Sequence, residues 1–228
     1  MKKVKGILFD FNGTLFFDSD YHLEAFQRCF EARGMERRSE EYIIRNMFGR
    51  TNNEIYLKNY DADADADALK AFEEEKEKKY TDFCLENPSK LHLCEGACEM
   101  LDYLKASDIP YCIATGSPLE NVEFYFEYLG LGRWFTMDNL VYCDGSFAGK
   151  PAPDIYLNAA KRLGLDASEC AVFEDGTSGM RSARAADAAR LIAVYEKGLP
   201  DPETDTVKSD EVHHDLTDWR GILERMGL

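Results

Sequence analysis

The sequence contains no apolar run long enough to cross a bilayer, and its first residues lack the pattern of a secretory signal peptide. We therefore expect neither a membrane-spanning nor an exported protein. Basic residues are also scarce, because 27 Lys and Arg stand against 43 Asp and Glu, for a formal charge of −16. Phosphate-rich surfaces repel such a charge, so nucleic acid and anionic membranes are not expected as partners. An anionic substrate would need local positive charge at its binding site.

The seven cysteines lack the spacing of a metal site. Cys94 and Cys98 are close in sequence, but no second pair of Cys or His residues completes a zinc site. Reduced thiols in a soluble, cytoplasmic protein are the expected explanation. A length of 228 residues with 45% hydrophobic residues suits one large domain, or a core with a smaller insertion.

The first apolar stretch, residues 4–10, predicts a buried strand that ends on Asp10. Asn12 and Gly13 follow, and a glycine permits a tight turn there. Open α/β sheets carry their chemistry at the carboxyl ends of strands, which is where Asp10 would lie. An Asn-Gly pair alone is more often a simple turn signal, so the interpretation depends on the rest of the chain.

The next segment, residues 17–88, shows only helical patterns. Thr51 and Glu54 have the spacing of a capping box, and a long final helix is expected to end at Asn87. Asp and Ala alternate over residues 61–67, which would place like charges on one face of a strand, so a loop and helix start is predicted instead. We expect a block of about four helices, inserted after the first strand.

After residue 88, strand and helix patterns alternate. Apolar segments predict strands at residues 110–114, 140–142, 170–173 and 191–195, and the tail from residue 212 predicts a last strand or turn and a short helix. Alternation of this kind implies an α/β fold, in which a parallel sheet has helices on both faces. The first strand belongs to that sheet.

Three later strands are followed by polar residues. Thr115, Gly116 and Ser117 lie where a helix should begin, and backbone N–H groups and a hydroxyl at a helix start can bind phosphate. Ser117 could instead be an N-cap, in a capping box with Glu120 and with Pro118 as the first helical residue. Capping explains Ser117 but leaves Thr115 without a role.

The two other motifs carry charge. Lys150 lies in a turn stiffened by Pro151 and Pro153, which is unusual for an ordinary surface lysine. Glu174 and Asp175 follow a predicted strand. Adjacent acids in a loop are commonly just solvated, but at a strand end that faces Asp10 they can bind a hard cation.

The order of these motifs is more specific than any one of them: strand-Asp-x-x-Gly-Thr, strand-Thr-Gly-Ser, Lys-Pro, strand-Glu-Asp-Gly. In this order the chain resembles the haloacid dehalogenase superfamily of phosphotransfer enzymes over essentially its whole length. It looks most like the branch that contains β-phosphoglucomutase and small phosphatases, which carries a helical cap. The resemblance implies a Rossmann-like, three-layer core formed by residues 1–16 and 89–228, with residues 17–88 as the cap domain.

The resemblance also implies a nucleophile and a metal site. Asp10 would accept the phosphoryl group. Mg²⁺ would be bound by Asp10, by the backbone carbonyl of Asn12 and by Asp175, while Glu174 would bind the water shell of the ion or bind a ligand directly. Such a cation offsets the repulsion between a carboxylate and a phosphate dianion.

A phosphate site is implied in the same way. Thr115 and the Gly116 N–H would bind phosphate oxygens, and Lys150 would neutralise their charge. In the cap, His22 aligns with a histidine that helps to couple cap closure to chemistry in the mutase branch. Arg50 could bind a second anionic group of the substrate. Either cap residue could equally be an ordinary surface side chain.

Asn12 departs from the family pattern, which has a second Asp at this position. That Asp protonates the leaving oxygen and later activates water, and an amide cannot do so. Loss of this help costs about 10²–10⁴ in rate. Other members of the superfamily also lack this Asp, including phosphonoacetaldehyde hydrolases and ion-pumping ATPases, so the change is compatible with catalysis.

The predicted function is that of a monomeric, Mg²⁺-dependent phosphatase of small phosphorylated metabolites, acting through a phosphoenzyme on Asp10 and slowed by Asn12. A sugar-phosphate mutase is one alternative, although Pro118 and Leu119 occupy positions that bind a second phosphate in the mutase branch. A phosphometabolite-binding protein with vestigial catalysis is another. Phosphonate cleavage would require a cap lysine, for which Lys58 is a candidate.

Overall fold

The computed structural model describes residues 3–228 and divides them into two compact units. The first unit contains residues 3–17 and His92–Leu228, and the second contains Asp18–Leu91. Residues 1 and 2, which belong to the predicted core segment 1–16, lie outside the described residues. Among the described helices, none is both long and apolar enough to cross a membrane.

The first unit is built from alternating strands and helices. Its elements are β1 (Gly6–Phe9), α5 (Ala97–Ala106), β2 (Tyr111–Ala114), α6 (Leu119–Tyr128), β3 (Leu140–Val141), α7 (Asp154–Arg162), β4 (Cys170–Glu174), α8 (Thr177–Ala185), β5 (Arg190–Val194), β6 (Glu211–His213) and α9 (Trp219–Met226). The second unit consists of α1 (Ser19–Ala32), α2 (Glu40–Asn46), α3 (Asn52–Asn59) and α4 (Ala66–Glu86), followed by a 3₁₀ turn at Pro88–Lys90.

Within the described chain, the strands form one six-stranded parallel sheet in the order β3-β2-β1-β4-β5-β6. The chain therefore builds one half of the sheet outward from β1 and then returns to build the other half from β4. Phe9 is paired with Ile113 on one side and with Phe173 on the other. Open α/β sheets bind ligands at such a switch point, outside the carboxyl ends of the strands. The predicted α/β fold class is confirmed.

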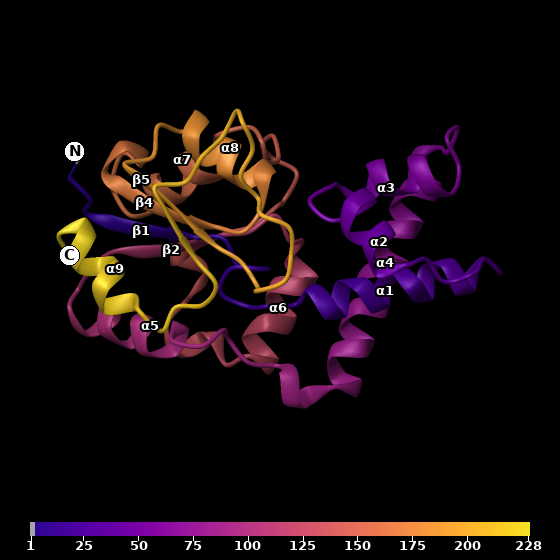
Figure 1. Ribbon diagram of the computed structural model, residues 1–228, viewed down its shortest axis with the longest axis horizontal. Helices are drawn as coiled ribbons and strands as arrows, with labels where there is room; N and C mark the ends of the chain where they lie inside the picture. The colour runs from indigo at the N-terminus through magenta and orange to yellow at the C-terminus, as the bar shows by residue number, and fades with distance from the viewer. Residues whose placement is uncertain (1–2) are drawn as a thin grey trace. The chain divides into compact units, whose positions relative to one another are not determined.

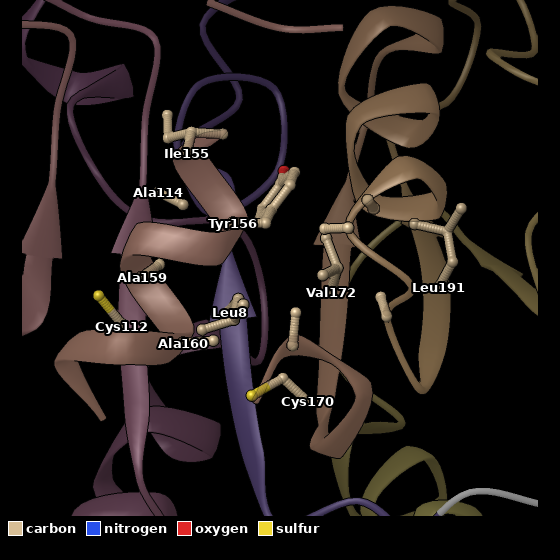
Figure 2. Packing of buried hydrophobic residues seen from close by; sticks show 14 of the residues in the cluster. Leu8, Cys112, Ala114, Ile155, Tyr156, Ala159, Ala160, Cys170, Val172 and Leu191 are labelled. Atoms are coloured by element: carbon tan, nitrogen blue, oxygen red, sulfur yellow. The ribbon is translucent and has the colours of Figure 1, made fainter. Parts of the chain in front are cut away.

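Helices cover both faces of this sheet, with α7 and α8 on one side and α5 and α9 on the other (Figure 1). Figure 2 shows how α7 packs over the central strands through Ile155, Ala159 and Ala160, which lie above Leu8 and Cys112. These side chains are 0–1% exposed. The two alanines let the helix approach the strands closely, and burial of the larger side chains supplies the hydrophobic stabilisation.

The helical unit has its own apolar core, which includes Phe26, Phe30, Ile43, Ile55 and Phe72. The predicted capping box is confirmed: the Thr51 hydroxyl accepts from the Glu54 N–H, and the Glu54 carboxylate accepts from the Thr51 N–H.

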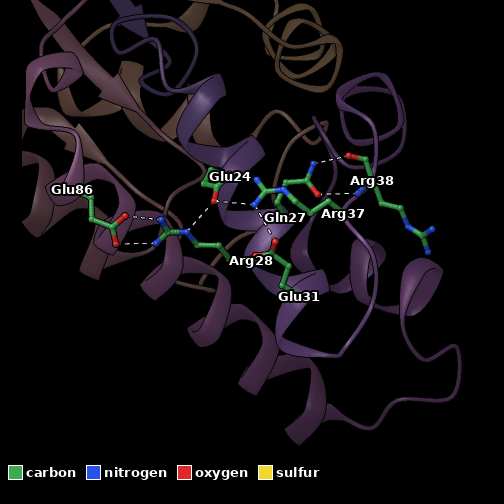
Figure 3. Close-up of polar contacts among 7 residues, drawn as sticks. All are labelled: Glu24, Gln27, Arg28, Glu31, Arg37, Arg38 and Glu86. Atoms are coloured by element: carbon green, nitrogen blue, oxygen red, sulfur yellow. Dashed lines mark hydrogen bonds and ion pairs between the residues drawn. The ribbon is translucent and has the colours of Figure 1, made fainter.

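Polar contacts join α1 to the segments around it, as Figure 3 shows. Arg28 binds Glu86 at the end of α4 and Glu24 within α1. Gln27 exchanges two hydrogen bonds with the backbone of Arg38, at 2.6 and 2.9 Å. Exposed ion pairs contribute little individually, but this network fixes the α1–α2 connection to α1.

Two glycines of the first unit allow a stability test. Gly96 and Gly164 both have left-handed backbones, with φ of +83° and +70°. A Cβ at Gly96 would lie 2.1 Å from the Leu216 carbonyl oxygen, whereas a Cβ at Gly164 would have no atom within 4 Å. Gly164→Ala should therefore cost only the backbone strain of about 1–2 kcal/mol. Gly96→Ala should cost about 1–3 kcal/mol more because the backbone must move. Urea unfolding of both variants measures this difference, and equal losses would contradict the close approach.

Candidate active site

Asp10 and Glu174 lie side by side because of the pairing between β1 and β4. Asp10 directly follows Phe9, and Glu174 directly follows Phe173, its paired residue. The Asp10 N–H donates to the Phe173 carbonyl at 2.9 Å, which extends the ladder by one step. Both side chains are nearly buried, with residue exposures of 7% and 1%. The sheet therefore places two carboxylates next to each other with little access to water.

Lys150 joins these carboxylates from the turn before α7. Its Nζ lies 2.6 Å from Asp10 Oδ1 and 2.6 Å from Glu174 Oε1. Burial raises the pKa of Asp10 to about 7, although the Lys150 ammonium opposes this shift. Burial by itself lowers the pKa of Lys150, but the attraction of Asp10 and Glu174 outweighs it and leaves that pKa above its usual value. Lys150 is therefore a fixed positive charge.

Glu174 is held by four protein donors. Its Oε1 accepts from Lys150 and from the Tyr156 hydroxyl at 2.7 Å, and its Oε2 accepts from the N–H groups of Asp175 and Gly176 at 3.0 and 2.9 Å. Burial, followed by repulsion from Glu174 and Asp10, raises the pKa of Tyr156 well above its usual value, so its hydroxyl stays protonated as a donor. An ionised carboxylate has about four lone-pair sites, so these four donors account for most of the hydrogen bonds that Glu174 can accept.

The same strand ends provide a possible cation site. Asp10, Glu174 and Asp175 each offer an oxygen within 4.8 Å of the others. Asp175 also approaches the turn after β1, because a Cβ at Gly13, whose φ is +75°, would lie 2.0 Å from Asp175 Oδ2. Three carboxyl groups lie together here, and the Lys150 ammonium contacts those of Asp10 and Glu174, so negative charge is in excess in this group of four. Oxygen donors with excess negative charge suit a hard divalent cation, and the residues therefore fit Mg²⁺.

The predicted phosphate site follows β2, next to β1. The Thr115 N–H donates to the Val141 carbonyl at 2.9 Å, which fixes this turn against β3. The Thr115 hydroxyl accepts from the Ser117 N–H at 3.1 Å. Gly116 is exposed, and the space where a Cβ would lie is open. A ligand can therefore approach the Gly116 backbone.

The predicted capping role of Ser117 is wrong. Helix α6 begins at Leu119 without a side-chain cap, and Ser117 Oγ instead donates to Asn12 Oδ1 at 2.8 Å. The Asn12 Nδ2 donates to the Tyr125 hydroxyl at 2.8 Å. Ser117 turns away from the helix because the extended backbone at Pro118 separates it from the first turn. The side chain of Asn12 therefore lies among hydroxyl groups of the turn after β2 and of α6.

Comparison with known proteins agrees with this geometry. The family model described as haloacid dehalogenase-like hydrolase matches residues 4–187. The chain belongs to the haloacid dehalogenase-like hydrolase family.

Individual relatives give the same result. A crystal structure of a haloacid dehalogenase hydrolase of family IA, variant 3, from Entamoeba histolytica is 32% identical, with a TM-score of 0.87 over 99% of this chain and 100% of that one. The phosphorylated carbohydrates phosphatase of Thermotoga maritima is 29% identical over 97% of this chain and 91% of its own. The fructose-1-phosphate phosphatase YqaB of Escherichia coli is 28% identical over 81% and 94%. The predicted superfamily and the predicted phosphoric monoester hydrolase class are confirmed.

The two predicted substrate contacts lie in the helical unit of this hydrolase. His22 Nε2 is 3.2 Å from Asp18 Oδ2, and its ring stacks on Tyr80 at 4.5 Å between centroids. The Tyr80 hydroxyl donates to the same Asp18 oxygen at 2.7 Å. Arg50 is exposed between α2 and α3. Asp10, Asn12, Thr115, Gly116, Lys150, Glu174 and Asp175, by contrast, all belong to the first unit.

Three residues that contact the site were not found from the sequence: Tyr156, Tyr125 and Gly179. In the sequence, the two tyrosines occupy ordinary apolar positions of predicted helices. A buried tyrosine nevertheless needs a hydrogen-bond partner for its hydroxyl, which a buried phenylalanine does not. A glycine within the helical stretch after Glu174 was a clearer signal, because glycine is costly in a helix and often marks a close approach. A Cβ at Gly179 would lie 1.6 Å from Glu174 Oε1.

Gly179 and Gly176 make a matched pair for testing the Glu174 contacts. Gly179→Ala must displace Glu174, whereas a Cβ at Gly176 would lie 3.8 Å from Glu174 Oε2, an ordinary contact. Displacement of a side chain that holds Lys150 should cost about 10²-fold in kcat/KM, since errors of an ångström in an active site have this effect. Gly176→Ala should retain most of the turnover. Assays with p-nitrophenyl phosphate, with melting temperatures recorded, test this, and equal activities would contradict the assigned role of Glu174.

Proposed function

We propose that this protein is a Mg²⁺-dependent phosphatase of small phosphorylated metabolites that acts through a phosphoenzyme on Asp10. The observation that carries the proposal is the buried contact of Asp10 with Lys150, beside the oxygens of Glu174 and Asp175. Relatives named as phosphatases of phosphorylated carbohydrates and of fructose 1-phosphate support sugar phosphates as the substrate class. The expected monomeric state and cytoplasmic location are part of the proposal.

Each residue has a distinct part in the proposed reaction. An Asp10 oxygen would attack phosphorus, while Lys150, Thr115 and the Gly116 N–H would bind the phosphoryl oxygens. Mg²⁺, held by Asp10, the Asn12 carbonyl and Asp175, would offset the charge of the phosphate. Glu174, whose oxygens are occupied by four donors, would mainly keep Lys150 and the following loop in place.

We propose that the helical unit acts as a cap that closes over bound substrate. The chain passes between the units twice, at residues 17–18 and 91–92. Beside these crossings, within the first unit, the Cys94 N–H donates to the Leu15 carbonyl at 2.8 Å and the Cys94 thiol to the Thr14 carbonyl at 3.4 Å. These hydrogen bonds therefore hold the two connections together on the side of the first unit.

A phosphometabolite-binding protein is the second candidate function, and the observation that favours it is the amide at position 12. Asn12 is hydrogen-bonded to Tyr125 and Ser117, and its amide cannot act as a general acid or base near neutral pH. Turnover of a panel of phosphoesters with Mg²⁺ separates the two candidates. A requirement for a sugar bisphosphate activator would instead indicate a mutase.

The metal site is tested by Asp175→Ala. Removal of this carboxylate should weaken Mg²⁺ binding by at least about tenfold, and hydrolysis at moderate Mg²⁺ should fall with it. Asp205→Ala, an exposed acid in the same unit, is the control for the loss of one negative charge. Calorimetric titration with Mg²⁺ measures binding independently of turnover. Unchanged Mg²⁺ affinity in Asp175→Ala would remove Asp175 from the site.

The role of position 12 is tested by Asn12→Asp. Without a general acid, p-nitrophenolate can leave unprotonated, but a sugar alkoxide cannot. Asn12→Asp should therefore speed hydrolysis of an alkyl phosphate by about 10²–10⁴ and of an aryl phosphate by less. In the parent protein, the phosphoenzyme on Asp10 should persist because no base activates water.

The measurements are kcat/KM for both substrates and acid-quench labelling of Asp10, with Asp10→Ala as the unlabelled control. Fast hydrolysis of sugar phosphates by the parent, with no gain in Asn12→Asp, would show that another residue supplies the proton. His22 would then be the first candidate.

A further inference from the structure

The turn that follows the nucleophile is built around one side chain of α6, that of Tyr125. The Phe11 ring lies 4.6 Å from the Tyr125 ring, and the Phe16 ring lies 6.2 Å from it. Tyr125 is 1% exposed. Phe11 and Phe16 lie at the two ends of the turn, so the Tyr125 ring packs against both ends of it. Packing therefore holds the Tyr125 ring in place independently of any hydrogen bond that its hydroxyl makes.

The hydroxyl of Tyr125 completes a triangle of polar contacts. Asn12 Nδ2 donates to it at 2.8 Å, Ser117 Oγ donates to Asn12 Oδ1 at 2.8 Å, and Ser117 Oγ lies 3.4 Å from the Tyr125 oxygen. Thr115 Oγ1 lies 3.5 Å from Asn12 Oδ1. These side chains come from three separate segments: the turn after β1, the turn after β2, and α6. The triangle joins the segments that carry the proposed metal and phosphate contacts.

An amide suits this position because it donates and accepts at the same time. Asn12 donates to Tyr125 while it accepts from Ser117. An ionised Asp could keep both partners only by accepting from both hydroxyls, so the Tyr125 hydroxyl would have to become the donor. The Asn12 side chain thus joins Tyr125 and Ser117 by hydrogen bonds, a role that does not involve proton transfer. Its own backbone carbonyl is the proposed Mg²⁺ ligand, and Ser117 adjoins the proposed phosphate contacts at Thr115 and Gly116.

We propose that Tyr125 is a positioning residue that acts through Asn12. Its hydroxyl holds the Asn12 amide against Ser117, and so keeps the metal-binding turn after β1 at a fixed distance from the phosphate-binding turn after β2. Active sites need such supporting contacts because small displacements of binding groups are costly. The proposal rests on the proposed function for the identity of the ligands. The proposal gives helix α6 a role in the site, although Tyr125 lies outside all four sequence motifs.

The test compares Tyr125→Phe with Tyr111→Phe. Both remove one buried tyrosine hydroxyl from the first unit, but the Tyr111 hydroxyl donates to the Trp134 carbonyl at 2.9 Å, and Trp134 is not one of the proposed site residues. The probe is inorganic phosphate in the presence of saturating Mg²⁺, titrated by calorimetry. Tyr125→Phe should weaken phosphate binding by about tenfold, the equivalent of one lost hydrogen bond. Tyr111→Phe should leave phosphate affinity unchanged, with a similar loss of melting temperature.

A double-mutant cycle shows whether Tyr125 acts through Asn12. In an Asn12→Ala background, Tyr125→Phe should change phosphate affinity by less than about twofold, because the intermediary is already absent. Ser117→Ala should mimic Tyr125→Phe, and Ser117→Thr, which keeps a hydroxyl, should restore binding. Equal effects of Tyr125→Phe in both backgrounds would overturn the proposal, as would no effect in the parent or an equal effect of Tyr111→Phe.

Ester hydrolysis by the parent is scored separately. Phosphate binding with the expected coupling but no turnover would refute the phosphatase and leave the positioning role intact. Turnover by the parent, together with unchanged phosphate affinity in Tyr125→Phe, would refute the positioning role and leave the phosphatase proposal intact. A parent protein that binds no phosphate would overturn the positioning role.

Discussion

The site depends on one buried ion cluster, in which the Lys150 ammonium lies 2.6 Å from both Asp10 and Glu174. Burying charges is unfavourable unless they are paired and hydrogen-bonded, and this cluster satisfies the condition through contacts from several segments. Removing one partner would leave an uncompensated charge in the protein interior. The turn before α7, the end of β1 and the end of β4 are therefore constrained together, and the positions of Asp175 and Tyr156 follow from those of Glu174.

The parallel sheet makes this cluster possible. Pairing of Phe9 with Phe173 brings the ends of β1 and β4 together although they are far apart in sequence. Glycines then allow contacts that other residues would block: Gly179 gives Glu174 its space, and Gly13 lets Asp175 approach the turn after β1. The ion pairs of Lys150 bring Asp10 and Glu174 together. The missing Cβ atoms of Gly179 and Gly13 leave the space that Glu174 and Asp175 occupy.

Asn12 gives the site its individual character. In relatives that have Asp at the position of Asn12, one side chain would both transfer the proton and make the supporting hydrogen bonds. Here the amide donates to Tyr125 and accepts from Ser117, but it cannot act as a general acid or base near neutral pH. The proposed enzyme would thus keep its nucleophile, cation and phosphate contacts while favouring leaving groups that need no proton, and its phosphoenzyme would be long-lived.

The fold class and the order of the motifs could be predicted from the sequence, because strand periodicity, capping patterns such as that of Thr51, and turn residues are local properties of the chain. The sequence also singled out Asp10, Lys150 and Asp175 as residues for testing. Two contacts could not be predicted in this way: Ser117 binds Asn12 rather than capping α6, and the Tyr125 hydroxyl accepts a hydrogen bond from Asn12. The reason is physical: a hydroxyl can satisfy its hydrogen bond with a local or a distant partner at similar energy, and which partner it meets depends on strand register and helix packing between segments that the sequence does not place side by side.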